Sequence, residues 1–141
     1  MLIGIHALLS PNLLHALAAM GHGDTIALVD ANYPATRGRR VIDLPGADIG
    51  QTLSAVLSVL PLDPFVADPA QVMQAADGAM PDAVAAINRV LAAGGHQPAA
   101  ALERFAFYAA AEAAYAIVLT GERRFYGNII LTKGVVAPDA A

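Results

Sequence analysis

The run Thr25-Ile26-Ala27-Leu28-Val29 constrains the fold more than any other stretch of the chain. It is unbroken, largely apolar and rich in β-branched residues, which is typical of a strand covered on both faces of a sheet. The polar turn His22-Gly23-Asp24 precedes it, and Asp30 follows it directly. Because ligands in open α/β sheets bind beyond the carboxyl ends of strands, His22 and Asp30 are the first candidates for chemistry.

The other apolar patterns predict helices and strands in alternation. Apolar residues recur at helical spacing in four stretches with good caps or stops: Ser10 to Gly21, Asp48 to Pro61, Pro81 to Gly94, and Glu103 to Ala113 or Ala114. Short apolar runs predict strands at 41–44, 98–102, 116–119 and 129–132. Residues 31–40, with Gly38, are expected to form a polar loop. The pattern at 65–76 fits a strand or the start of a helix equally well.

Length and composition limit the organisation of the chain. Its 141 residues fit one domain, which we place at 1–137, with a loose tail at 138–141. The chain is 57% hydrophobic and only 14% charged, and this apolar excess predicts a homo-oligomer. A net charge of −4 argues against nucleic acid as a partner.

The sequence also favours a cytoplasmic protein. It contains no cysteine, which excludes a disulfide framework and thiolate chemistry. The first 21 residues carry no Asp, Glu, Lys or Arg, but Pro11 splits this run, and neither half approaches the roughly 18 to 20 apolar residues of a membrane span. We therefore expect neither a signal peptide nor a membrane segment.

Several kinds of site are excluded by their motifs. The sequence contains no phosphate-binding loop, dinucleotide fingerprint, zinc-protease motif or nucleophile elbow, and its four scattered histidines do not predict a metal site. A histidine in a glycine turn and a carboxylate at a strand end suit proton transfer on a neutral, polyhydroxylated molecule. A plain turn is the alternative, with His22 as a turn residue and Asp30 as a cap.

Four separated blocks carry a resemblance to a known family. They are Met20-Gly21-His22-Gly23-Asp24, Asp30-Ala31-Asn32-Tyr33-Pro34, Arg104-Phe105-Ala106-Phe107-Tyr108, and Thr120-Gly121-Glu122 followed by Tyr126-Gly127-Asn128-Ile129-Ile130-Leu131 and Lys133-Gly134. Over nearly its whole length the chain resembles the family of L-fucose mutarotases and D-ribose pyranases. The resemblance implies a three-layer α/β/α domain with a mixed, largely buried sheet. It also implies pentameric rings that pair as decamers, and a cofactor-free active site near the subunit boundary.

The resemblance further implies a role for individual residues. His22 is the expected proton donor, and Tyr108 and Tyr126 are the expected catalytic tyrosines. The expected contacts to the sugar are Asp30, Asp63, Met73, Arg104, Gly127 and Asn128. The fucose branch is similar to this chain in having Arg104 and Tyr108, whereas the ribose branch has a histidine at the first position and no aromatic residue at the second.

The implied activity is that of an isomerase that needs no cofactor. A proton is added to the ring oxygen of a free aldopyranose and another is removed from its anomeric hydroxyl. The ring then opens, and it recloses as the other anomer of L-fucose. Two alternatives stay open: a D-ribose pyranase, which recloses the ring through a different hydroxyl, and a sugar-binding ring protein without turnover.

Overall fold

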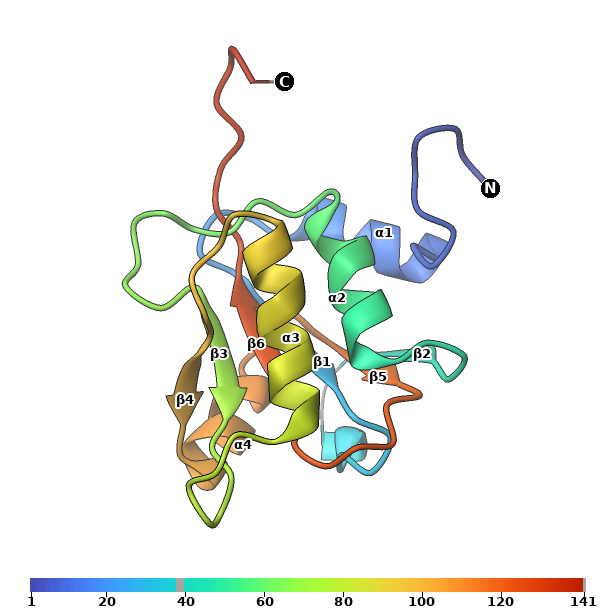
Figure 1. Ribbon diagram of the computed structural model, residues 1–141. Coiled ribbons are helices and arrows are strands. Elements are labelled where there is room, and N and C mark those ends of the chain that lie inside the picture. Colours follow the sequence, from blue (N-terminus) through green and yellow to red (C-terminus); the bar gives the residue numbers. More distant parts are fainter. Residues whose placement is uncertain (38–39, 141) are drawn as a thin grey trace.

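The computed structural model describes residues 1–37 and 40–140, and helices and strands alternate along this part of the chain until the last two strands, which follow one another (Figure 1). Its helices are α1 (Pro11–Ala19), α2 (Ile49–Leu57), α3 (Asp82–Ala93) and α4 (Arg104–Glu112), with a short 3-10 helix, η1 (Ala35–Arg37). Its strands are β1 (Thr25–Val29), β2 (Val41–Leu44), β3 (Ala70–Met73), β4 (Ala100–Leu102), β5 (Ala116–Thr120) and β6 (Ile129–Thr132). The predictions for Gly38 in the polar loop and Ala141 in the tail lie outside the described residues.

These strands form one mixed sheet in the order β2-β5-β1-β6-β3-β4. β1 runs parallel to β5 and antiparallel to β6, and β6 runs antiparallel to β3. The ends of β1 and β3 therefore meet the start of β6 on one side of the molecule, which we call the carboxyl end of the sheet. The start of β1 and the end of β6 meet on the opposite side, the amino end.

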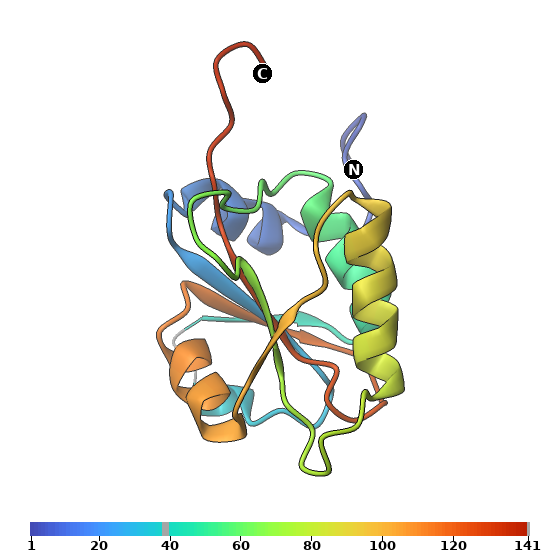
Figure 2. The same ribbon diagram turned by 60° about the vertical axis from the view of Figure 1, so that its left-hand side comes forward.

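Helices cover both faces of the sheet, as the three-layer expectation requires. α1, α2 and α3 lie on one face, whereas α4 and η1 lie on the other (Figure 2). Ile26 and Leu28 of β1 belong to the larger apolar cluster, beneath α1 to α3. Ala27 and Val29 belong to the smaller cluster, around Phe107 of α4. These four residues of β1 are fully buried, which confirms that this strand is covered on both faces.

The second helix begins as predicted but ends early. The Asp48 side chain caps its first turn, and the helix ends at Leu57, not at Pro61. The Ser58 hydroxyl donates to a backbone carbonyl of the last turn (2.6 Å), which helps to close the helix there. The prediction was wrong because Leu60 continues the apolar pattern as a buried side chain, 3% exposed, beyond the helical backbone.

The ambiguous stretch at 65–76 contains a strand. β3 pairs with β6 on one side and with β4 on the other, which the local pattern does not reveal, and most of its side chains are buried. β4 confirms the strand predicted at 98–102. Within residues 1–37 and 40–140, no helix is long and apolar enough to cross a membrane.

Candidate active site

Asp30 lies at the carboxyl end of β1 and is only 7% exposed. Asn128, just before β6, accepts a hydrogen bond from the backbone N–H of Asp30 (2.9 Å) and donates one to its Oδ2 (3.2 Å). The backbone N–H of Asn32 donates to Oδ1 (3.0 Å). Burial raises the pKa of the Asp30 carboxyl, although these hydrogen bonds favour its charged form. The site therefore holds a poorly hydrated carboxylate that suits the binding of hydroxyl groups.

Tyr126 and Gly127 place a strained loop beside this carboxylate. Tyr126 has φ 63°, in the left-handed region that residues other than glycine rarely adopt. Its hydroxyl accepts a hydrogen bond from the backbone N–H of Ala76 (3.2 Å), which fixes the ring. A Cβ atom at Gly127 would lie 2.6 Å from Cγ of Glu122, so the chain needs glycine there for packing.

Arg104 and Tyr108 occupy successive turns of α4 and share one helix face. Nε of Arg104 donates to the Tyr108 hydroxyl (3.3 Å), and its guanidinium carbon lies 5.5 Å from the centroid of that ring. The arginine is exposed and the tyrosine half-buried. The pair places a permanent positive charge beside a phenol oxygen that can exchange a proton.

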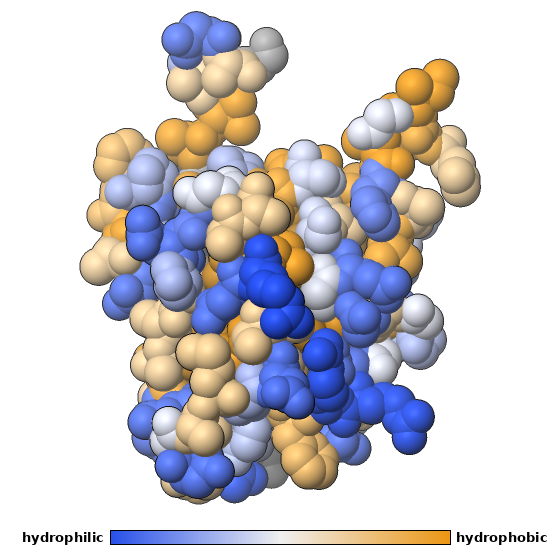
Figure 3. Space-filling model, viewed as in Figure 1, coloured by the Kyte–Doolittle hydropathy of each residue, from blue (hydrophilic) through white to orange (hydrophobic). Residues whose placement is uncertain are grey.

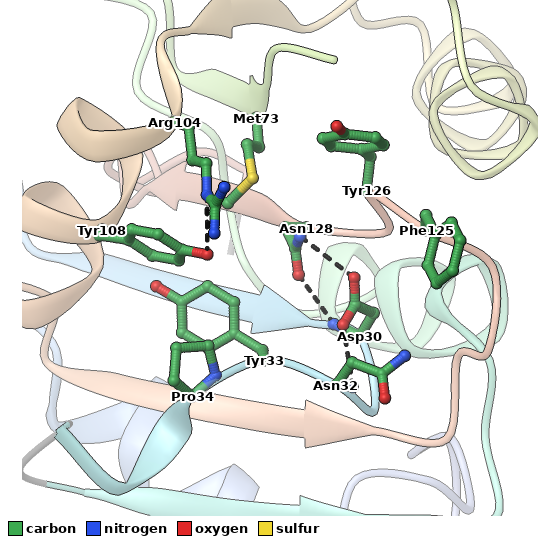
Figure 4. Close-up of a pocket in the computed structure, with 10 residues that line it drawn as sticks. All are labelled: Asp30, Asn32, Tyr33, Pro34, Met73, Arg104, Tyr108, Phe125, Tyr126 and Asn128. Carbon is green, nitrogen blue, oxygen red and sulfur yellow. Dashed lines mark hydrogen bonds between the residues drawn. The ribbon is translucent and has the colours of Figure 1, made fainter. Parts of the chain in front are cut away.

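A pocket of about 280 Å³ lies between these groups (Figure 4). It is lined by Asp30, Asn32, Tyr33, Pro34, Met73, Arg104, Tyr108, Phe125, Tyr126 and Asn128. Because drug-sized ligands occupy pockets of about 300 to 1,000 Å³, this volume suits a smaller molecule such as a single sugar ring. Its lining combines hydrogen-bonding groups for hydroxyls with aromatic faces for the apolar side of such a ring.

Glu122 anchors the loops that form this pocket. Its buried carboxylate pairs with Arg124 (2.9 Å) and accepts from the backbone N–H of Ile49 at the start of α2 (3.2 Å). Its backbone carbonyl accepts from the N–H of Ala31 (2.8 Å), next to Asp30. The hydrogen bonds from Arg124, which outweigh the effect of burial, lower the pKa of Glu122 to about 2. The charged turn predicted at 121–124 is therefore centred on an ion pair between a buried glutamate and an exposed arginine.

His22 and Asp63 form a second polar group at the amino end of the sheet. Nε2 of His22 lies 3.1 Å from Oδ2 of Asp63, and the His22 ring meets the Phe65 ring edge-on, with centroids 5.8 Å apart. Asp63 is buried, and the backbone N–H of Phe65, followed by His22, lowers the pKa of its carboxyl. The His22 side chain stays 47% exposed. Among the described residues, no three His, Asp or Glu side chains are grouped so that they could share a metal ion.

The chain matches known proteins over nearly its whole length. A model of the RbsD / FucU transport protein family matches residues 3–136. The chain belongs to this family. It is 48% identical over 141 residues to an L-fucose mutarotase of Glaesserella parasuis, and the alignment covers 96% of each chain.

Two solved structures of the family share the fold. One is the crystal structure of the fucose mutarotase in complex with L-fucose from Streptococcus pneumoniae, with a TM-score of 0.91, 38% identity, and coverage of 96% of this chain and 100% of that chain. The other is Bacillus subtilis RbsD complexed with D-ribose, with a TM-score of 0.73, 27% identity, and coverage of 94% and 98%. These matches confirm the resemblance carried by the four sequence blocks.

The structure brings together most of the residues that the family resemblance singles out. Those that line the pocket are Asp30, Met73, Arg104, Tyr108, Tyr126 and Asn128. Gly127 lies between two of them, and its packing against Glu122 explains its presence. His22 and Asp63 lie at the other end of β1, so one chain does not place them in this pocket.

Four pocket residues were not among the sequence candidates: Asn32, Tyr33, Pro34 and Phe125. The first three belong to the block that begins at Asp30, so the resemblance itself was the available signal. Phe125 lies next to the block that begins at Tyr126, and its exposed position gives no apolar pattern.

Proposed function

We propose that this protein interconverts the α and β anomers of free L-fucose. One observation carries the proposal: the buried Asp30–Asn128 pair and the Arg104–Tyr108 pair line one pocket of a size that suits a single sugar ring (Figure 4). The similarity to an L-fucose mutarotase and to a fucose mutarotase with L-fucose bound supports this choice of substrate.

Anomer exchange needs two proton transfers and the opening and closing of one C–O bond within the sugar. The anomeric hydroxyl loses one proton, the ring oxygen gains one, and the bond between C1 and the ring oxygen breaks to give the open aldehyde. Rotation about the C1–C2 bond presents the other face of the aldehyde, and the reverse transfers close the ring. Nothing outside the sugar is consumed, so the reaction requires no cofactor.

The two pocket tyrosines suit the role of proton carriers. Arg104 donates to the Tyr108 oxygen, so its charge stabilises that oxygen when the phenol gives up its proton. The N–H of Ala76 donates to the Tyr126 oxygen in a similar way. General acid and base groups such as these tyrosines each raise the reaction rate by about a hundredfold to ten-thousandfold. Asp30 and Asn128 hold the sugar hydroxyls.

We further infer that His22 acts in the pocket of a partner subunit. The five residues of β1, which lie between His22 and Asp30, alone span about 17 Å at 3.3 to 3.4 Å per residue, too far for one sugar ring to bridge. His22 is nevertheless held by Asp63 and partly exposed, next to Phe65, which is 75% exposed. These features suit a head-to-tail contact in which His22 and Asp63 of the partner subunit complete the pocket.

A homo-oligomer of pentameric rings, paired as decamers, is part of this proposal. Apolar side chains on the surface support it: Figure 3 shows hydrophobic residues on both projecting terminal segments, which include the exposed Met1, Ile3 and Val136. Residues 1–137 act as one unit in this arrangement. We place the protein in the cytoplasm, because a chain without cysteine suits a reducing compartment.

The D-ribose pyranase reaction begins with the same ring opening and is the second candidate. The contact between Arg104 and Tyr108 favours the fucose branch, because the ribose branch is expected to have a histidine in place of the arginine and to lack this aromatic residue. A sugar-binding protein without turnover would have no need for two hydrogen-bonded phenols in one pocket.

Saturation transfer between the anomeric protons, measured by NMR for L-fucose and separately for D-ribose, tests the proposal. We expect faster exchange of L-fucose, reduced about a hundredfold or more in Tyr108→Phe. Tyr115→Phe is the matched control, because Tyr115 lies under Arg40 outside the pocket, with the guanidinium 4.1 Å from its ring. Binding without faster exchange would identify a sugar-binding protein, and acceleration confined to D-ribose would identify a pyranase.

A further inference from the structure

Tyr33 is a pocket residue that the proposed mechanism does not use. Its backbone N–H donates to the carbonyl of Asp30 (3.2 Å), and its carbonyl accepts from Ala35 (2.8 Å). Its ring meets the fully buried Phe107 edge-on, with centroids 6.2 Å apart, and the ring of Tyr108 at 5.5 Å. The ring is therefore fixed by backbone hydrogen bonds and by aromatic packing.

The hydroxyl of this fixed ring is available to a ligand. Tyr33 is half-buried and lines the pocket with Asp30 and Tyr108 (Figure 4). Within residues 1–37 and 40–140, its hydroxyl makes no hydrogen bond, and no buried side-chain nitrogen or oxygen atom lacks a partner. The hydroxyl therefore does not lie in a sealed core, and it can hydrogen-bond to a molecule in the pocket.

The surroundings of Tyr33 keep its hydroxyl protonated. Burial, followed by the neighbouring Tyr108, Glu112 and Asp30, raises the pKa of Tyr33 to about 12. The nearby cation, Arg104, donates to Tyr108 instead. A phenol in this environment is a poor proton carrier near neutral pH but a good neutral hydrogen-bond donor.

We propose that Tyr33 is a specificity residue, whose hydroxyl donates a hydrogen bond to one ring hydroxyl of the bound sugar while other groups carry the protons. This inference rests on the proposed function of the pocket. Tyr33 and Asp30 belong to one rigid turn, so together they select a sugar with two hydroxyls at matching positions. A sugar that lacks the hydroxyl opposite Tyr33 then binds less tightly, because the phenol is left without its partner.

Tyr33→Phe tests this role, because phenylalanine keeps the ring and its packing. We expect KM for L-fucose to rise about 2- to 12-fold, as for the loss of one neutral hydrogen bond, with kcat and its pH profile unchanged. Tyr115→Phe, at a tyrosine outside the pocket, serves as the control and should leave KM unchanged. The melting temperature of each variant checks that the fold is intact.

Monodeoxy analogues of L-fucose identify the hydroxyl that Tyr33 contacts. One analogue should bind the wild type more weakly than L-fucose does, yet bind the wild type and Tyr33→Phe equally well. A fall in kcat or a shifted pH profile in Tyr33→Phe would make Tyr33 a proton carrier, and unchanged kinetics with every analogue would make it a packing residue; either result overturns the proposal. If the wild type binds L-fucose without turnover, the proposed function fails, whereas the same affinity series still tests Tyr33.

Discussion

Two impaired variants are expected to restore activity to each other. His22→Gln removes the group at the amino end of the sheet, and Asp30→Ala removes the carboxylate at the carboxyl end, with the whole of β1 between them. If each pocket takes His22 from a partner subunit, an oligomer that contains both variants has some pockets with both groups intact. Each variant alone has none.

The size of the effect follows from this arrangement. In rings assembled at random from equal amounts of the two variants, an intact pocket needs one chain with Asp30 beside another with His22. The chance of each is one half, so about a quarter of the wild-type exchange rate should return. The two chains are coexpressed with different affinity tags, mixed rings are purified through both tags, and exchange between the anomers of L-fucose is measured by NMR.

The control mixes two variants damaged at the same end, Asp30→Ala and Asn128→Ala, whose pockets cannot complement each other under this arrangement. If mixed rings of His22→Gln and Asp30→Ala exchange anomers no faster than the separate variants, the partner contribution is refuted. Full activity of His22→Gln by itself would remove His22 from the reaction.

Three further predictions concern the pocket and its support. Gly127→Ala should lower the free energy of unfolding by about 1 to 3 kcal/mol in a urea titration, because the new methyl group meets Cγ of Glu122; an unchanged midpoint would contradict this packing. Because the pKa of Glu122 is lowered, its ion pair stabilises the fold fully above about pH 4.5, and roughly 3 kcal/mol of this stabilisation is lost as the pH falls toward 2. Glu122→Gln should therefore lose less stability over this pH range than the wild type, and an equal loss in both proteins would contradict this role of Glu122. Asp30→Ala should weaken L-fucose binding about 10- to 100-fold in calorimetry, whereas Asp68→Ala, at an exposed aspartate outside the pocket, should not; normal affinity of Asp30→Ala would exclude its role.

The fold was predictable where one local pattern decides the outcome. The apolar run of β1 and the caps at Ser10 and Asp48 gave elements close to those observed. β3 could not be assigned in advance, because its place in the sheet depends on pairing with β6, more than fifty residues later in the chain. The early end of α2 was missed because Leu60 is buried without being helical.

The site was predictable as a set of residues and less so as an arrangement. The family blocks supplied Asp30, Asn128 and the residues of α4, which the fold then places in one pocket. His22 lies before β1 and Asp30 directly after it, so the two residues must lie at opposite ends of this strand. Tyr33 lies in a polar loop where neither spacing nor hydropathy distinguishes it from its neighbours.

Because the carboxylate of Asp30 is buried in the pocket, the melting temperature of the protein should report which ligands bind there. A carboxylate that has lost much of its water regains hydrogen bonds from any ligand with suitably spaced hydroxyls, and a ligand that binds only the folded chain stabilises it according to its concentration relative to Kd. Melting curves can therefore rank sugars and simple polyols by affinity, including molecules without an anomeric carbon that no exchange assay would detect.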